Sequence, residues 1–220
     1  MGCTASGPEL NPAEAALSGL EHSLHFDSFT VNQHFFILRR YSQSSAFLNA
    51  VAFEEAAKAM KIRTTNSLTS PNTEEFYASL RSPEIKARDL AVLAVLLAPG
   101  SDNEKAEVLF EAYDPTYSKL LPRASIEEMV KDLIDMSVIR IQVLVEGLAE
   151  DKNKVQDYLS ALREQKVTSV PQLVQAVVGE KTQIAVSEFM SAFGKPDCQA
   201  LLSSQKMRRL LYSRLAVKPV

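Results

Sequence analysis

The sequence predicts an all-α fold, and two observations carry this prediction. Six segments combine a helix-capping residue with a Glu or Gln three positions later, so that each side chain can accept a backbone N–H at a helix start. They begin at Asn11, Thr30, Asn72, Ser101, Ser125 and Ser169. Apolar residues then recur every three or four positions, which is typical of amphipathic helices. Strand signals are confined to short apolar segments such as residues 182–185.

The expected helices can be placed in chain order from these starts. Pro12 stands at a first helical position after Asn11, where a missing N–H is tolerated. Residues 90–98 are wholly apolar and predict a buried helix, because the run is about half as long as a membrane span. Further helices are expected over residues 151–164, from residue 196 and over residues 200–215, which gives about eleven in all.

Composition limits the classes of protein that are expected. The 220 residues are 46% hydrophobic and 23% charged, which is enough to bury one large or two small cores. A net charge of -3 provides no basic field, so no nucleic-acid partner is expected. The two cysteines, Cys3 and Cys198, do not form a disulfide framework, and no signal peptide is recognised. We therefore expect an intracellular chain.

The segment that follows the apolar helix, up to residue 134, carries a family resemblance. Its matching residues are Gly100, Glu104, Lys105, Phe110, Tyr113 and Asp114. In this order they resemble the middle of EF-hand proteins of the neuronal calcium sensor, calcineurin B-like and calaxin group. Residues 183–189 resemble the exit of a fourth loop, and residues 51–55 and 85–89 resemble, more weakly, the exits of a first and a second.

The resemblance implies two lobes of paired EF-hand-like helix–loop–helix units with short or absent loop strands. It places an N-terminal lobe at residues 12–98 and a C-terminal lobe at residues 99–195. A flexible tail, residues 1–11, precedes the lobes, and a basic amphipathic helix with its own tail, residues 196–220, follows them. A generic helical bundle with the same apolar spacing is the alternative, and it is all-α as well.

The loops depart from the pattern of a working calcium site. Such a loop needs oxygen ligands at positions 1, 3 and 5, a glycine at position 6 and a bidentate glutamate at position 12. The third loop begins with Asp114 but has Ser125 at position 12, and the fourth has Lys181 at position 5 before Glu188. We therefore predict degenerate loops, no calcium, no other metal and no cofactor apart from covalent lipid.

Patterns of catalytic residues are lacking in the sequence. The histidines, His22, His25 and His34, do not have the spacing of a metal site, and no nucleophile elbow or phosphate-binding glycine loop occurs. Cys198 is at an expected helix start, a place that lowers thiol pKa values, but no base accompanies it, which favours a packed side chain. We predict that the protein is not an enzyme. A small hydrolase or transferase whose site forms only in three dimensions is the open alternative.

The segment ALLSSQKMRRLLYSRL, residues 200–215, predicts a basic amphipathic helix. Its charged residues are Lys206, Arg208, Arg209 and Arg214. Three interpretations stay open: the helix docks on its own domain, lies on anionic lipid, or occupies an apolar groove until a partner displaces it. Outside the docked state, the four cationic side chains would form a surface for lipid or for a protein partner.

The first six residues, MGCTAS, match the N-myristoylation pattern, in which Gly2 is acylated after removal of Met1 and Ser6 completes the motif. One myristoyl chain binds a bilayer only marginally, with an association constant on the order of 10⁴ M⁻¹, so stable anchoring needs a second signal. A palmitoyl group on Cys3 would provide that signal. We expect a lipid-anchored protein on the cytoplasmic face of a membrane, with a cytosolic fraction.

These observations predict a non-enzymatic, membrane-anchored adaptor. Its apolar grooves would bind an amphipathic helix of a partner protein without calcium. The alternative is a calcium-independent structural component of a cytoskeletal or ciliary assembly, which the calaxin resemblance allows.

Overall fold

The computed structural model describes residues 11–42, 46–62, 71–80, 84–148 and 150–215, and within them the chain is all-α, as predicted. The α-helices are α1 (Pro12–His22), α2 (Val31–Ser42), α3 (Ala50–Ala59), α4 (Pro71–Leu80), α5 (Ala87–Leu97), α6 (Asp102–Tyr113), α7 (Arg123–Ile134), α8 (Gln142–Val145), α9 (Lys152–Val178), α10 (Val186–Ala192), α11 (Pro196–Gln199) and α12 (Ser204–Leu215). The other elements are the 3-10 turns η1 (Phe26–Ser28) and η3 (Ala200–Leu202), the π-helical turn η2 (Asp135–Arg140), and the strands β1 (Phe47–Leu48), β2 (Ile85–Lys86), β3 (Leu120–Pro122) and β4 (Gln183–Ala185).

Predicted caps mark the starts of three helices. The side chain of Asn11 accepts a hydrogen bond at 3.0 Å from a backbone N–H in the first turn of α1. Ser101 and Glu104 form both halves of a capping box at α6. At α2, the N–H of Thr30 donates to the side chain of Gln33 at 2.9 Å. Short-range polar contacts therefore fix where these helices begin.

Three other predicted helix starts are wrong. Helix α4 already includes Asn72, and α7 already includes Ser125. Ser169 lies inside α9, which continues through Pro171 as one helix of 27 residues. The helix expected over residues 151–164 is thus the first part of α9. Because α9 packs against α1, α7 and α12, tertiary burial outweighs the local signals for a break.

Short strands join the helices into four pairs: α2–β1–α3, α4–β2–α5, α6–β3–α7 and α9–β4–α10. β1 pairs with β2 and β3 pairs with β4, both antiparallel. Leu48 lies opposite Ile85 and Leu121 opposite Ile184, and all four side chains are buried. Each strand pair therefore connects two helix pairs through backbone hydrogen bonds and an apolar contact. The EF-hand resemblance itself stays a prediction.

The sequence indicated the exit of a first loop at residues 51–55, but these residues lie inside α3. β1 ends at Leu48 and α3 begins at Ala50, so the connection lies about one helical turn earlier. The side chain of Asn49 accepts from the N–H of Ala52 at 2.9 Å and caps α3. Val51 is 74% exposed and does not serve as the central apolar residue. A single apolar residue matched to a pattern cannot distinguish Leu48 from Val51.

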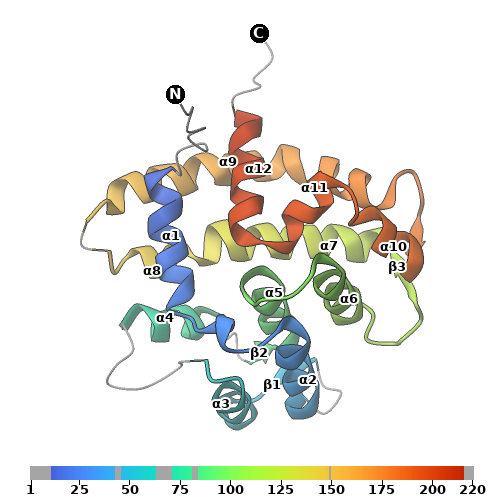
Figure 1. Cartoon of the computed structure of the whole chain (residues 1–220), viewed down its shortest axis with the longest axis horizontal. Helices are drawn as coiled ribbons and strands as arrows, with labels where there is room; N and C mark the ends of the chain where they lie inside the picture. The colour runs from blue at the N-terminus through green and yellow to red at the C-terminus, as the bar shows by residue number, and fades with distance from the viewer. Residues whose placement is uncertain (1–10, 43–45, 63–70, 81–83, 149, 216–220) are drawn as a thin grey trace, which may run out of the picture.

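The buried side chains form one connected core. Helix α5 lies near the middle of the molecule and α1 at its left-hand side in Figure 1. The apolar run at residues 90–98 forms most of α5, which packs against α2, α6 and α7, as expected for a buried helix. Helix α1, which the sequence placed in an N-terminal lobe, packs against α8 and α9. The first helix is therefore held by elements from the later part of the chain.

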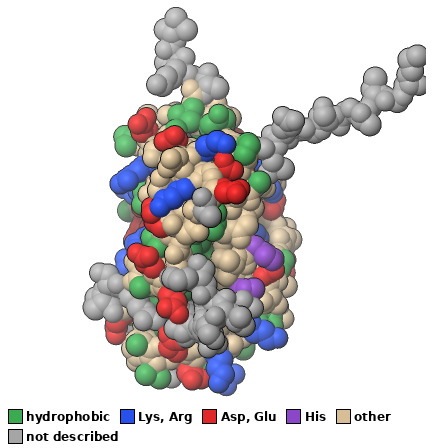
Figure 2. All heavy atoms as spheres, turned by 90° about the vertical axis from the view of Figure 1, so that its left-hand side faces the viewer, with side chains coloured by type: hydrophobic (Ala, Val, Ile, Leu, Met, Phe, Trp, Pro, Cys, Tyr) green, Lys and Arg blue, Asp and Glu red, His purple; other side chains and the backbone are tan. Residues whose placement is uncertain are grey.

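The start of α1 and the end of α12 lie at the same edge of the molecule (Figure 1). Figure 2 shows the side of the molecule on which α8 and the start of α9 lie, and acidic and basic side chains are interspersed there. Across the described ranges, no helix combines the length and the apolar composition needed to cross a bilayer.

Candidate functional site

A buried ionic cluster ties the first helix to the last. Arg208 of α12 is fully buried and donates to Glu14 at 2.8 Å from Nε and 3.2 Å from Nη2. It also donates to Glu21 at 2.5 Å from Nη1 and 3.1 Å from Nη2. The carbonyl of Ser137 accepts from Nη1 at 3.2 Å, and the hydroxyl of Tyr158 donates to Glu14 at 2.7 Å. We call these five residues the Arg208 cluster.

Burial and charge act against each other in the Arg208 cluster. Removal from water lowers the pKa of Arg208, but the neighbouring carboxylates of Glu21 and Glu14 raise it by more, so the guanidinium stays charged. Burial and the contact with Glu14 raise the pKa of Tyr158, so its hydroxyl remains a donor. Two carboxylates share one guanidinium, which leaves one net negative charge when all three groups are ionised.

The π-helical turn η2 provides the backbone partner of Arg208. A π turn inserts an extra residue into a helix and interrupts the regular hydrogen-bond ladder, and such turns are frequent at functional sites. Ser137 in this turn is buried, and its hydroxyl donates to the carbonyl of Leu133 at 2.7 Å. The carbonyl of Ser137 accepts a hydrogen bond from the guanidinium of Arg208. The irregular turn therefore completes the set of acceptors around Arg208.

Arg208 is not part of a lipid or partner surface, and the prediction for this residue is wrong. Its burial is the reason, because α12 docks on α9 and η2 and turns Arg208 toward α1. Lys206 and Arg209 are exposed, and Arg214 is half-buried and lies 3.4 Å from Asp197 in an ion pair. Of the three interpretations of residues 200–215, docking on the protein's own fold is the one that applies.

The sequence contains a signal of this cluster, which is the presence of charged residues on otherwise apolar helix faces. Met207, Arg208 and Leu211 share the buried face of α12, so a charged residue interrupts an apolar face. Glu14 and Glu21 are two turns apart and flank the same buried face of α1. Glu14 was expected to cap α1, but its carboxylate binds Arg208 instead. Charged residues at core positions indicate a buried partner, although they do not identify it.

In the third loop, donor groups of the loop itself form hydrogen bonds to the carboxylate of Asp114. One oxygen of Asp114 accepts from the N–H and hydroxyl of Ser118, both at 2.9 Å, and the other accepts from the N–H of Lys119 at 2.7 Å. Burial raises the pKa of Asp114, but these hydrogen bonds lower it by more, to below its ordinary value. Lys119, where a calcium loop has glycine, adopts a left-handed conformation with φ of 60°.

The fourth loop places an ammonium group against its last carboxylate. Lys181 forms an ion pair with Glu188, which also accepts from the N–H of Ala185 at 3.2 Å. The hydrogen bond from Lys181 lowers the pKa of Glu188 most, and the hydrogen bond from the N–H of Ala185 lowers it further. Lys181 thus neutralises the carboxylate that a calcium loop would offer at position 12. Within the described part of the chain, no group of three or more His, Cys, Asp or Glu side chains could hold a metal ion.

The rings of His22 and His25 are neighbours, with centroids 6.3 Å apart, but neither belongs to a group of three or more described His, Cys, Asp or Glu side chains that could hold a metal ion. His34 is buried, with Nε2 2.9 Å from the carbonyl of Phe26, and burial lowers its pKa although that contact raises it. His22 lies 3.3 Å from Asp27 at the surface. Cys198 is buried, and burial raises its pKa to about 11, which disfavours the reactive thiolate at neutral pH. The expectation of a packed cysteine is confirmed.

The predicted acylation residues, Gly2, Cys3 and Ser6, lie outside the described residues. No family model, curated protein or solved structure matches the chain. Similarity therefore assigns neither a family nor a function, and the residues and contacts of this chain carry the proposals that follow.

Proposed function

We propose that the protein is a non-enzymatic adaptor, anchored to the cytoplasmic face of a membrane by myristate on Gly2 and palmitate on Cys3. The observation that carries the proposal is the sequence MGCTAS, which satisfies the myristoylation pattern and places a cysteine beside the acylated glycine. Two acyl chains provide the stable anchoring that one chain does not.

The position of α12 supports an orientation in which the edge that carries the start of α1 faces the membrane. Arg209 lies at the middle of α12 and Arg214 in its last turn, and the end of α12 lies at the same edge of the molecule as the start of α1 (Figure 1). A lipid-anchored tail that precedes α1 would bring this edge close to the membrane. Cationic side chains at that edge would then be attracted to anionic headgroups. Arg208 is excluded from this role by its burial.

The helix pair α2–β1–α3 is the proposed partner surface. It exposes Phe36 by 70%, Phe47 by 42% and Val51 by 74%. Large apolar side chains exposed on neighbouring elements often mark a contact with another protein. We infer that an amphipathic helix of a partner protein packs on these residues, in the mode that helix-binding grooves commonly use.

Calcium independence is part of the proposal. Lys181 already compensates Glu188 within the fourth loop, and the loop's own N–H groups already bind Asp114 in the third. A calcium ion would have to displace these contacts without gaining a full set of oxygen ligands. Partner binding is therefore proposed to depend on surfaces that are formed without the ion.

Fractionation of cells that express the native chain, Gly2→Ala and Cys3→Ser tests the anchor. The native chain should sediment with membranes, Gly2→Ala should be soluble, and Cys3→Ser should be largely soluble because one acyl chain binds marginally. Thr4→Ala is the matched control, since position 4 is unspecified in the pattern, and it should behave as the native chain does. Retention of Gly2→Ala in a detergent-insoluble pellet would refute the anchor and favour the cytoskeletal alternative.

A further inference from the structure

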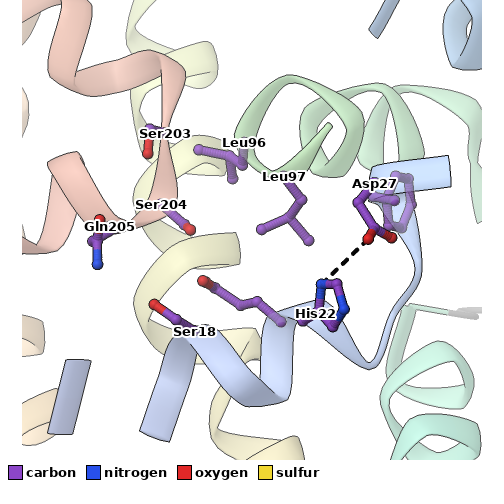
Figure 3. A pocket seen from close by; sticks show the side chains of 10 residues that line it. Ser18, His22, Asp27, Leu96, Leu97, Ser203, Ser204 and Gln205 are labelled. Atoms are coloured by element: carbon purple, nitrogen blue, oxygen red, sulfur yellow. Dashed lines mark ion pairs between the residues drawn. The ribbon is translucent and has the colours of Figure 1, made fainter. Parts of the chain in front are cut away.

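A pocket opens beside the Arg208 cluster, between the end of α1, the turn η1, the end of α5 and the start of α12 (Figure 3). Its volume is about 220 Å³. The polar lining residues are Ser18, Glu21, His22, Asp27, Ser203, Ser204 and Gln205, and the apolar ones are Phe26, Leu96 and Leu97. The pocket therefore combines an acidic and hydroxyl-rich wall with a short apolar one.

The charge around the pocket is negative. Glu21 lines it and shares Arg208 with Glu14, so one guanidinium faces two carboxylates. Asp27 adds a second acidic side chain at the rim, 3.3 Å from the imidazole of His22. In the lining and the Arg208 cluster, the three carboxylates of Glu14, Glu21 and Asp27 accompany one guanidinium. A bound cation would compensate charge that the protein leaves unbalanced.

The helix ends around the pocket favour the same sign. Helix α1 ends at His22 and α5 ends at Leu97, and both residues line the pocket. The carboxyl end of a helix carries partial negative charge, which stabilises a nearby cation. Helix α12 begins at Ser204 with the opposite polarity. Two negative helix ends and the carboxylates together outweigh this single positive one.

Ser204 provides an independent sign that a ligand belongs here. It is only 4% exposed, and its hydroxyl has no hydrogen-bond partner among the described residues. The side chain points into the pocket (Figure 3). A ligand that entered the pocket with a donor group would give this hydroxyl a hydrogen-bond partner. Ser18, across the pocket on α1, offers a second hydroxyl oxygen.

We propose that this pocket binds a cationic nitrogen group, a primary ammonium or a guanidinium, carried on a short aliphatic stem. The group donates to the carboxylates of Glu21 and Asp27 and to the hydroxyl of Ser204, while the stem packs against Leu96 and Leu97. The same chemistry is found in a free alkylamine and in the lysine or arginine side chain of a partner protein. The site does not depend on lipid anchoring.

Titration of the full-length folded chain with n-butylammonium chloride, followed by amide NMR, tests the site. Saturable shifts should be confined to residues around the pocket, such as Ser18, His22 and Gln205. Asp27→Asn should weaken the affinity about fivefold, because it removes one nearby charge without touching the Arg208 cluster. Glu107→Gln, an exposed acidic position on α6, is the matched control and should leave the affinity unchanged.

Equal shifts with n-butanol, no saturation, or an unchanged affinity of Asp27→Asn would each overturn the proposal. A short peptide with one central lysine, compared with its norleucine counterpart, identifies the source of the cation. Binding of the lysine peptide at least ten times tighter than that of n-butylammonium would assign the pocket to a partner side chain. Comparable affinities would assign it to a free amine.

Discussion

Arg208→Met should destabilise the protein more than any nearby surface substitution. The methionine fills much of the same volume but removes all five hydrogen bonds that the guanidinium donates. Glu14 and Glu21 would remain buried as unpaired charges. Breaking a buried ion pair from one side typically lowers the free energy of unfolding by about 3–5 kcal/mol. For a chain of this size, that corresponds to a melting temperature lower by roughly 10 °C.

Urea and thermal unfolding, followed by circular dichroism, measure the effect. Arg209→Met is the matched control, because it removes the adjacent exposed arginine and should change stability by no more than about 0.5 kcal/mol. The triple variant Glu14→Gln/Glu21→Gln/Arg208→Met should recover much of the loss, since it leaves no buried charge unpaired. A loss for Arg208→Met as small as that for Arg209→Met would refute the buried ionic contact between α12 and α1.

Three further predictions concern His34, Asp114 and the binding of calcium. Burial lowers the folded-state pKa of His34 below its ordinary 6.5, so the unfolded chain binds more protons below that pH. Stability should therefore fall as the pH drops through 6.5, by up to about 1.4 kcal/mol per pH unit from this group, and His34→Gln should remove that part of the slope in urea unfolding. An unchanged slope would contradict the burial of His34. Asp114→Ala leaves the N–H groups of Ser118 and Lys119 without an acceptor and should cost about 1–2 kcal/mol, whereas Asp114→Asn should cost less; equal losses would count against the loop contacts. Isothermal titration with calcium should give no saturable heat, and micromolar binding that exposes apolar surface would disprove calcium independence.

Local signals predicted much of the secondary structure. Asn11 and Ser101 cap helices where the sequence indicated, because a cap depends only on neighbouring residues. The apolar run at residues 90–98 became a buried helix, and residues 182–185 include β4. The all-α class followed from the sum of such signals.

Long-range contacts decided what local signals could not. Ser169 and Pro171 indicate a break, but α9 is continuous because its neighbours bury it on several sides. The sequence does not distinguish Arg208 from the other charges of a basic helix, because its partners are on α1. The acidic pocket depends on α1, α5 and α12 meeting at one point, and no spacing along the chain encodes that meeting.

Mass spectrometry of the N-terminal peptide, isolated from native protein without reducing agents or hydroxylamine, tests the central claim most directly. The proposal predicts that Met1 is absent, that Gly2 carries an amide-linked myristoyl group, and that Cys3 carries a palmitoyl thioester that hydroxylamine removes. An N-terminus that retains Met1, or a Gly2 that carries only a free or acetylated amine, would contradict it.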